Sequence, residues 1–347
     1  MPVKPRRAPR PGTSFAACNG WQPPCGHATP QAHFQHATAT EPSHPARVSP
    51  RRSFPSQQRG SARSATPPST MRFQRSRFLP WISAACLSAA LLAGAAWAGT
   101  AEGVRAYDRG QFALAAKELQ PAAQAGDPEA QFHLGLMHDF GKGVQLDHAK
   151  AAALYRKAAE QGHADAQYHL AVSYDDGEGV PQDFKQAVYW YTQAANQGLA
   201  KAQYNLGVSY DKGEGVAKDH QMAAQWYRKA ADQGDSDAQY NLGVAYDEGE
   251  GVPQDHQQAV AWYRKAAAQN HVRAQFNLAV SYDDGEGVAQ DKKQAVHWYT
   301  KAAEQGDADA QQNLSVMYAR GEGVARDAAK SRYWARKARE SRARGED

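Results

Sequence analysis

The chain has 347 residues, and its 40 Lys and Arg against 36 Asp and Glu give a formal net charge of +4. This charge is uneven, because residues 1–70 hold nine Lys and Arg against one Glu and residues 71–98 hold three Arg and no acid, which leaves residues 99–347 with a net charge of −7. Such an acidic balance argues against nucleic acid as the main partner. All three cysteines, Cys18, Cys25 and Cys86, precede residue 99, which excludes a disulfide framework, a thiolate metal site and a cysteine nucleophile from the rest of the chain.

The first 98 residues read as two segments. Residues 1–70 are rich in Pro, Arg, Ser and His without apolar periodicity, and predict a disordered arm. From Met71, three arginines precede an apolar run that ends in Ala-Trp-Ala at 96–98. This pattern is typical of a bacterial secretory signal peptide over 71–98, cleaved after Ala98, so we expect a periplasmic or secreted protein whose true start is Met71, with residues 1–70 not translated. An uncleaved membrane anchor and lipidation at Cys86 are the alternatives.

Residues 99–127 predict a degenerate unit that caps the N-terminus of a repeat array. Ala115, for example, stands one 36-residue period before Ala151. Asp127 and Pro128 suit the N-cap and the first position of the next helix. Pro121 falls inside the second helix of this unit, which we expect it to bend or shorten.

A 36-residue period governs the chain from residue 128, and Gln167 marks it by recurring in every unit. In the first half of the unit, Ala166 and Leu170 begin an apolar stripe with helical spacing. Two glycines then allow a tight reversal, and Asp183 is placed as the N-cap of a second helix. The apolar face of that second helix is the clearest signal, with spacings of 3, 4, 7 and 8 residues. Its members are Ala187, Trp190, Tyr191, Ala194 and Ala195.

The pattern A-x-A-Q-Y-x-L-G-x-x-Y-x-x-G-x-G-V-x-x-D, followed by A-x-x-W-Y-x-x-A-A-x-Q-G, resembles the Sel1-like repeat, a relative of the tetratricopeptide repeat. The resemblance implies an all-α fold, a right-handed superhelical solenoid of antiparallel helix pairs in which each unit buries its apolar face against its neighbours. Six copies are expected, at 128–163, 164–199, 200–235, 236–271, 272–307 and 308–343, before a tail at 344–347.

Residues that could carry chemistry are found mainly around the loops. Acidic loops such as that of Asp175 and Glu178 lack the spacing of a calcium-binding EF-hand, so we interpret them as solvated turns and helix caps. Asp-His pairs at 147/148, 219/220 and 255/256 are assigned to helix starts, because equivalent positions on successive repeats lie roughly 8–10 Å apart, too far to share a metal ion. No catalytic or nucleotide-binding motif is present. We therefore expect no enzyme activity, no cofactor and no metal.

The candidate binding surface is the stripe of the first helix that the relatives place on the concave face. An aromatic and apolar row edged by acids suits an extended peptide or a helix with basic residues, although the same side chains could instead pack repeat against repeat. The aromatic ladder is Tyr168, Tyr204, Tyr240 and Phe276, and beside it stand Val172, Val208, Val244 and Val280. The acids are Asp175, Asp211, Asp247 and Asp283, the amides are Asn205, Asn241, Asn277 and Asn313, and the copies differ at Lys201, Arg273 and Lys212.

The resemblance and the missing catalytic motifs favour a non-enzymatic scaffold or adaptor of the bacterial cell envelope that binds other proteins, with no stable membrane insertion after signal cleavage. The alternative is a hydrolase of cell-wall or β-lactam substrates, as in a cysteine-rich branch of Sel1-like proteins, but no repeat here contains cysteine. The last helix, from Arg326 to Arg344, is basic. We interpret it as a solvated terminal cap, with a second docking patch for an acidic partner as the alternative.

Overall fold

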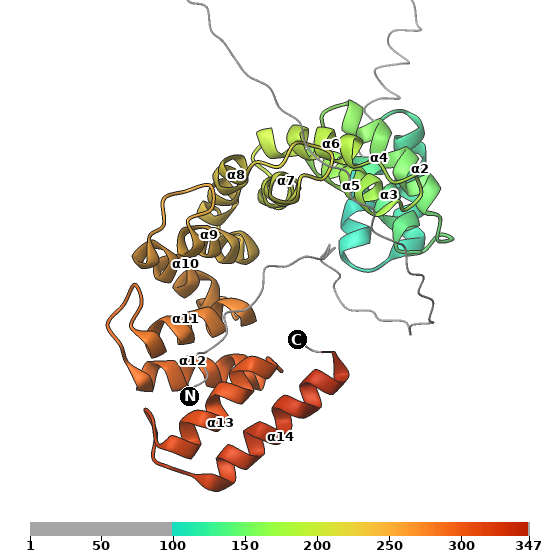
Figure 1. Cartoon of the computed structure of the whole chain (residues 1–347). Helices are drawn as coiled ribbons and strands as arrows, with labels where there is room; N and C mark the ends of the chain where they lie inside the picture. Colours follow the sequence, from blue (N-terminus) through green and yellow to red (C-terminus); the bar gives the residue numbers. More distant parts are fainter. Residues whose placement is uncertain (1–98, 346–347) are drawn as a thin grey trace, which may run out of the picture. The chain divides into compact units, whose positions relative to one another are not determined.

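A computed structural model describes residues 99–345, and in this part of the chain every regular element is helical (Figure 1). Residues 99–108 are helical, and from α2 onward each helix packs against the next one in the chain, as expected for a solenoid of helix pairs. The helices are α2 Phe112–Gln124, α3 Pro128–Asp139, α4 His148–Glu160, α5 Ala164–Asp176, α6 Phe184–Asn196, α7 Ala200–Lys212, α8 His220–Asp232, α9 Ser236–Glu248, α10 His256–Ala268, α11 Val272–Asp284, α12 Lys292–Glu304, α13 Ala308–Arg320 and α14 Ala328–Arg344.

The helix boundaries follow from local chemistry. Asp183 caps α6, because its Oδ1 accepts hydrogen bonds from the backbone N–H groups of Lys185 at 3.0 Å and Gln186 at 3.1 Å. Equivalent aspartates cap the other second helices, at Asp147, Asp219, Asp255, Asp291 and Asp327. At the other end of the loop, Gly177 ends α5 in the left-handed conformation with φ of 75°. The predicted caps and turns are therefore confirmed.

The hydrophobic core is built between repeats as well as within them. Tyr191 on α6 is only 1% exposed and packs in one cluster with Leu206 on α7 and with Trp226 on α8, which belong to the next repeat. Small residues make room for these rings: a Cβ added at Gly207 would lie 2.7 Å from the ring of Tyr227. Each repeat thus completes the core of the repeat before it.

Loop glycines bring successive repeats into backbone contact. Gly251 has φ of 72°, and a Cβ there would lie 2.0 Å from the carbonyl oxygen of His220, the first residue of α8 in the preceding repeat. No side chain fits in that space, and the positive φ independently favours glycine. Gly179, Gly215, Gly287 and Gly323 approach the preceding second helix in the same way.

A buried chain of glutamine hydrogen bonds, here called the glutamine ladder, joins the repeats. Gln167 Nε2 donates to the carbonyl oxygen of Ala159 at 3.0 Å, and its Oε1 accepts from Gln197 Nε2 at 2.7 Å. The arrangement repeats through the array and ends at Gln311, whose buried Oε1 has no partner among residues 99–345 because position 341 is Ser. The ladder residues that occupy first helices are Gln131, Gln167, Gln203, Gln239, Gln275 and Gln311.

One expectation was partly wrong. Pro121 lies inside α2 but does not shorten it, since α2 has the same 13 residues as most helices of the array. Only three residues of α2 follow Pro121, and two of them, Ala122 and Ala123, are buried in the core, so packing holds the last turn in place. Among residues 99–345, no helix combines the length and apolar character that crossing a bilayer requires. The expected arm at 1–70 and signal peptide at 71–98 lie outside the described residues.

Candidate functional site

The aromatic ladder of the first helices lies against the second helices of the same repeats. Ring centroids of Tyr204 and Tyr227 are 5.9 Å apart, and the equivalent pairs in other repeats lie at 5.7–6.2 Å. Tyr240 and Phe276 are at most 2% exposed and belong to the core, whereas Tyr168 and Tyr204 are half-buried. At Tyr240 and Phe276 the structure therefore follows the packing alternative, and only Tyr168 and Tyr204 offer part of an aromatic edge to a ligand.

The valine and asparagine rows also face neighbouring helices to differing extents. Val244 and Val280 are buried, while Val172 and Val208 are half-buried. Asn205 Nδ2 donates to the hydroxyl oxygen of Tyr191, in the preceding repeat, at 3.1 Å. This asparagine thus bonds the neighbouring helix. Asn277 is buried, and Asn241 is half-buried.

The acidic row is tied to the second helices. Asp175 Oδ2 accepts a hydrogen bond from the Tyr191 hydroxyl at 3.2 Å, and burial raises the pKa of the Asp175 carboxyl above its usual range. Asp247 is 5% exposed, and Asp283 Oδ1 lies 2.5 Å from Lys292 Nζ. These carboxylates are placed to hold the helix pair together, which leaves them less free to meet a ligand than the sequence pattern suggested.

Charged positions at the start of the first helices stay on the surface. Lys201 is exposed and Arg273 is half-buried, and neither forms a hydrogen bond or an ion pair with any residue from 99 to 345. Lys212 differs, because its Nζ lies 3.4 Å from Glu214. The two cations interrupt a row that is otherwise acidic, at Glu129, Asp165, Asp237 and Asp309.

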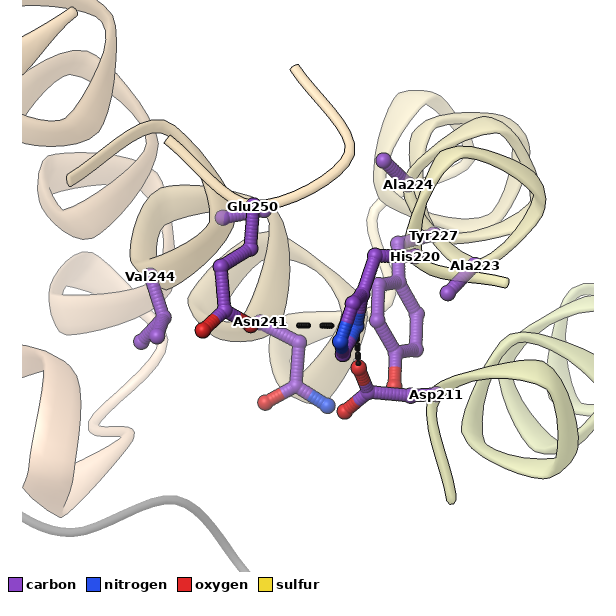
Figure 2. A pocket seen from close by; sticks show the side chains of 9 residues that line it. Asp211, His220, Ala223, Ala224, Tyr227, Asn241, Val244 and Glu250 are labelled. Carbon is purple, nitrogen blue, oxygen red and sulfur yellow. Dashed lines mark hydrogen bonds and ion pairs between the residues drawn. The ribbon is translucent and has the colours of Figure 1, made fainter. Parts of the chain in front are cut away.

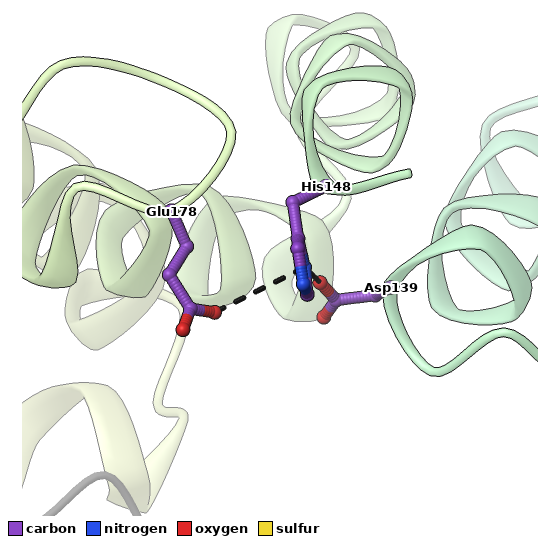
Figure 3. A group of neighbouring side chains, drawn as sticks. All are labelled: Asp139, His148 and Glu178. Carbon is purple, nitrogen blue, oxygen red and sulfur yellow. Dashed lines mark hydrogen bonds and ion pairs between the residues drawn. The ribbon is translucent and has the colours of Figure 1, made fainter. Parts of the chain in front are cut away.

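A cluster missed by the sequence analysis joins two repeats at Asp139, His148 and Glu178, here called the first cluster (Figure 3). His148 Nδ1 lies 2.9 Å from Asp139 Oδ1, at the end of α3, and 4.0 Å from Glu178 Oε2, in the loop of the next repeat. The aspartate beside the histidine in sequence, Asp147, instead caps α4 by accepting from the backbone N–H of Lys150 at 2.9 Å. The histidines do occupy helix starts, as expected, but the adjacent aspartate is not their partner.

The same arrangement recurs at Asp211, His220 and Glu250, here called the central cluster (Figure 2). His220 Nδ1 lies 2.6 Å from Asp211 Oδ1 and 3.7 Å from Glu250 Oε2. The three side chains line a cavity of about 20 Å³ together with Tyr227 and Asn241. In the sequence, each cluster corresponds to a histidine with an Asp nine residues before it and a Glu thirty residues after it. This spacing indicates a cluster only when the stacking of the repeats is known.

The basic last helix, α14, packs through a narrow face. Ala338 and Ser341 are buried, and Arg342 Nη2 lies 2.8 Å from Asp309 Oδ1 on α13. Most of the remaining basic side chains of α14 are exposed, namely Lys330, Arg332, Arg336, Arg339 and Arg344, as is Arg326 in the loop before the helix. Both the terminal-cap interpretation and the docking-patch alternative are compatible with this placement.

Comparison with known proteins places this architecture in a family. A protective antigen of uropathogenic Escherichia coli, whose crystal structure displays an SLR fold, is 41% identical in sequence to this chain, and the two structures superpose with a TM-score of 0.63. The match covers 65% of this chain and 48% of the antigen, so this chain spans about half of the antigen's length. A Sel1 repeat protein from Oxalobacter formigenes is 35% identical, with a TM-score of 0.62, over 69% of this chain and 96% of that one. No curated protein matches the chain. The Sel1 repeat model matches residues 128–163, 164–199, 200–235, 236–271, 272–307 and 308–341. These matches cover more than half of the chain, which therefore belongs to the Sel1 repeat family.

Proposed function

We propose that this protein is a non-enzymatic scaffold of the bacterial cell envelope that binds an extended protein segment along the starts of its first helices. Sel1 repeat proteins generally serve as scaffolds for protein interactions. The observation that carries the proposal is the pair of cations, Lys201 and Arg273, which form no hydrogen bond or ion pair with residues 99–345 and interrupt an otherwise acidic row. The equivalent position is acidic in the other four repeats, so Lys201 and Arg273 give this row a defined order of charges.

The geometry favours a segment with alternating charges. Consecutive first helices present exposed Asp165, Lys201 and Asp237 one repeat apart, so a bound segment would meet negative, positive and negative charge in turn. Exposed charges of this kind steer association and select partners more than they add affinity. The half-buried edges of Tyr168 and Tyr204 supply apolar contact beside them.

The envelope location rests on the predicted signal peptide at 71–98 and is tested separately. Mass spectrometry of the protein exported by its bacterial host should find an N-terminus at Gly99. Recovery of peptides from residues 1–70 in the exported protein would contradict both the cleavage and the start at Met71.

The binding surface is tested by charge reversal. Partners captured from envelope extract are identified, purified and titrated against wild type, a K201D/R273D variant and a K185D/K293D control. The control reverses two exposed lysines near the starts of the second helices and so makes the same change in net charge. We expect at least a ten-fold loss of affinity for K201D/R273D and little change for the control. Equal effects of the two variants, or no effect of either, would contradict the assignment of the binding surface.

A further inference from the structure

We propose that the central cluster, and more weakly the first cluster, bind a divalent cation of the zinc class that bridges neighbouring repeats. Each cluster offers one imidazole nitrogen and two carboxylate oxygens, and these ligand atoms lie within 4.8 Å of one another. Two of the three ligands come from one repeat and the third from the loop of the next repeat, so a bound ion would link repeats that otherwise meet by packing and hydrogen bonds.

The ligand atoms lie close together. In the central cluster both carboxylates approach the same nitrogen, His220 Nδ1, with Asp211 Oδ1 at 2.6 Å and Glu250 Oε2 at 3.7 Å. A tetrahedral zinc ion with bonds of 2.0–2.1 Å holds its ligand atoms about 3.3 Å apart. The observed separations lie on both sides of this value, so small side-chain rotations bring the three atoms into zinc-binding positions.

The surroundings also suit an ion. The cavity of about 20 Å³ at the central cluster exceeds the roughly 10–15 Å³ that one water molecule needs, and therefore has room for a single ion. In the first cluster, the Tyr155 hydroxyl donates to Asp139 Oδ2 at 3.1 Å. This bond orients the carboxylate so that Oδ1 faces His148, a support typical of metal ligands.

The donor set selects the kind of ion. Calcium and magnesium prefer six or more oxygen ligands, whereas an imidazole with carboxylates suits zinc and similar transition metals. Two carboxylates also balance the charge of a divalent ion. The central cluster is more enclosed, since the Glu250 side chain is 38% exposed and that of Glu178 is 64% exposed. We therefore expect tighter binding at the central cluster.

The chain contains its own controls for this geometry. His256 has the same sequence context, but Asp247 lies on its Nδ1 at 2.8 Å while Glu286 lies on its Nε2 at 3.1 Å. Because these two carboxylates contact different nitrogens of the His256 ring, they are not placed to bind one ion together with a single ring nitrogen. Position 184 in repeat two carries Phe at the same place, which shows that a His-to-Phe exchange is compatible with the repeat.

The experiment counts bound zinc by equilibrium dialysis of the full-length chain at a buffered free Zn²⁺ concentration of about 10 µM and pH 7.5. Wild type is compared with H148F/H220F and with the control H256F, and circular dichroism verifies that each variant is helical. We expect H148F/H220F to bind two ions fewer than wild type, H256F to bind as many as wild type, and Zn²⁺ to raise the Tm of wild type and H256F but not of H148F/H220F.

A second pair of substitutions avoids changing the helix start. E178Q/E250Q removes the ligand contributed by the following repeat while keeping the size of the side chain, and should lower zinc affinity at least ten-fold. Equal zinc content in wild type and H148F/H220F would overturn the proposal. So would an equal loss of zinc in H256F, since that result would indicate adventitious binding to exposed imidazoles rather than convergence on one ion.

Discussion

Replacing Trp226 by Ala removes a large side chain that joins two repeats. The indole is 7% exposed and packs in one cluster with Tyr191 of the preceding repeat and with Leu206 of its own repeat. A buried aromatic side chain removes roughly 150–250 Å² from water, which at about 25 cal/mol per Å² corresponds to about 4–6 kcal/mol. Its Nε1 has no hydrogen-bond partner among residues 99–345, and removing a buried unsatisfied donor offsets about 1–3 kcal/mol. We therefore expect a net loss of about 3 kcal/mol in the free energy of unfolding.

Urea unfolding followed by far-UV circular dichroism measures this loss. Trp226→Phe keeps an aromatic ring but removes the unpartnered N–H, so it should cost about 1 kcal/mol or less. Tyr189→Ala provides a surface control, because Tyr189 is 52% exposed, and should change stability by about 0.5 kcal/mol or less. A loss below about 1 kcal/mol for Trp226→Ala would refute the view that this face of α8 is core between repeats.

Two further predictions concern backbone contact and pH. Gly251→Ala should lower the free energy of unfolding in urea by more than about 2 kcal/mol, because the added Cβ clashes with the His220 carbonyl and alanine disfavours a positive φ. Gly234→Ala is the control, since Gly234 has φ of 96° with open space around it, and it should cost only about 1 kcal/mol. Equal costs for the two variants would show that the loop at Gly251 does not closely approach the His220 carbonyl. Burial lowers the pKa of His169 below its ordinary value, so as pH falls through that ordinary value the unfolded chain binds a proton that the folded chain does not, and stability falls. His169→Asn introduces the residue that the next repeat has at the equivalent position, Asn205. This variant should lose less stability than wild type between pH 7.5 and 5.0. Equal decreases of the urea midpoint in the two proteins would exclude the His169 imidazole as the source of the pH dependence.

Local signals in the sequence were sufficient to predict the helices and their boundaries. The cap at Asp183, the left-handed Gly177 and the buried face of Ala187 and Tyr191 each depend on neighbours within about one helical turn or one loop. Because these signals recur with a fixed period, they also predicted that helix pairs stack in sequence order. The fold was therefore predictable without knowledge of any contact between distant residues.

The candidate site was less predictable because its environment is set by the neighbouring repeat. Tyr204 and Tyr240 occupy the same position in nearly identical sequences, but Tyr240 is more deeply buried and stacks on His271, the N-cap of the first helix of the next repeat, with ring centroids 4.7 Å apart. Likewise, the adjacent Asp147 was the obvious candidate partner for His148, whereas the structure uses the side chain of Asp147 for a backbone N–H and supplies Asp139 instead. Sequence proximity does not reveal which carboxylate the fold brings within reach of a histidine.

The glutamine ladder limits how an array of this kind can change in length. Each buried amide, such as Gln203, donates to a carbonyl of the preceding second helix and accepts from the C-cap glutamine of the second helix of its own repeat, here Gln233. An insertion or deletion of part of a repeat would shift one of these partners and leave a buried amide unsatisfied, at a cost of about 1–3 kcal/mol. Gain or loss of whole 36-residue units restores every bond on both sides of the junction. Duplication and excision of complete repeats are therefore the tolerated routes by which such a protein can grow or shrink.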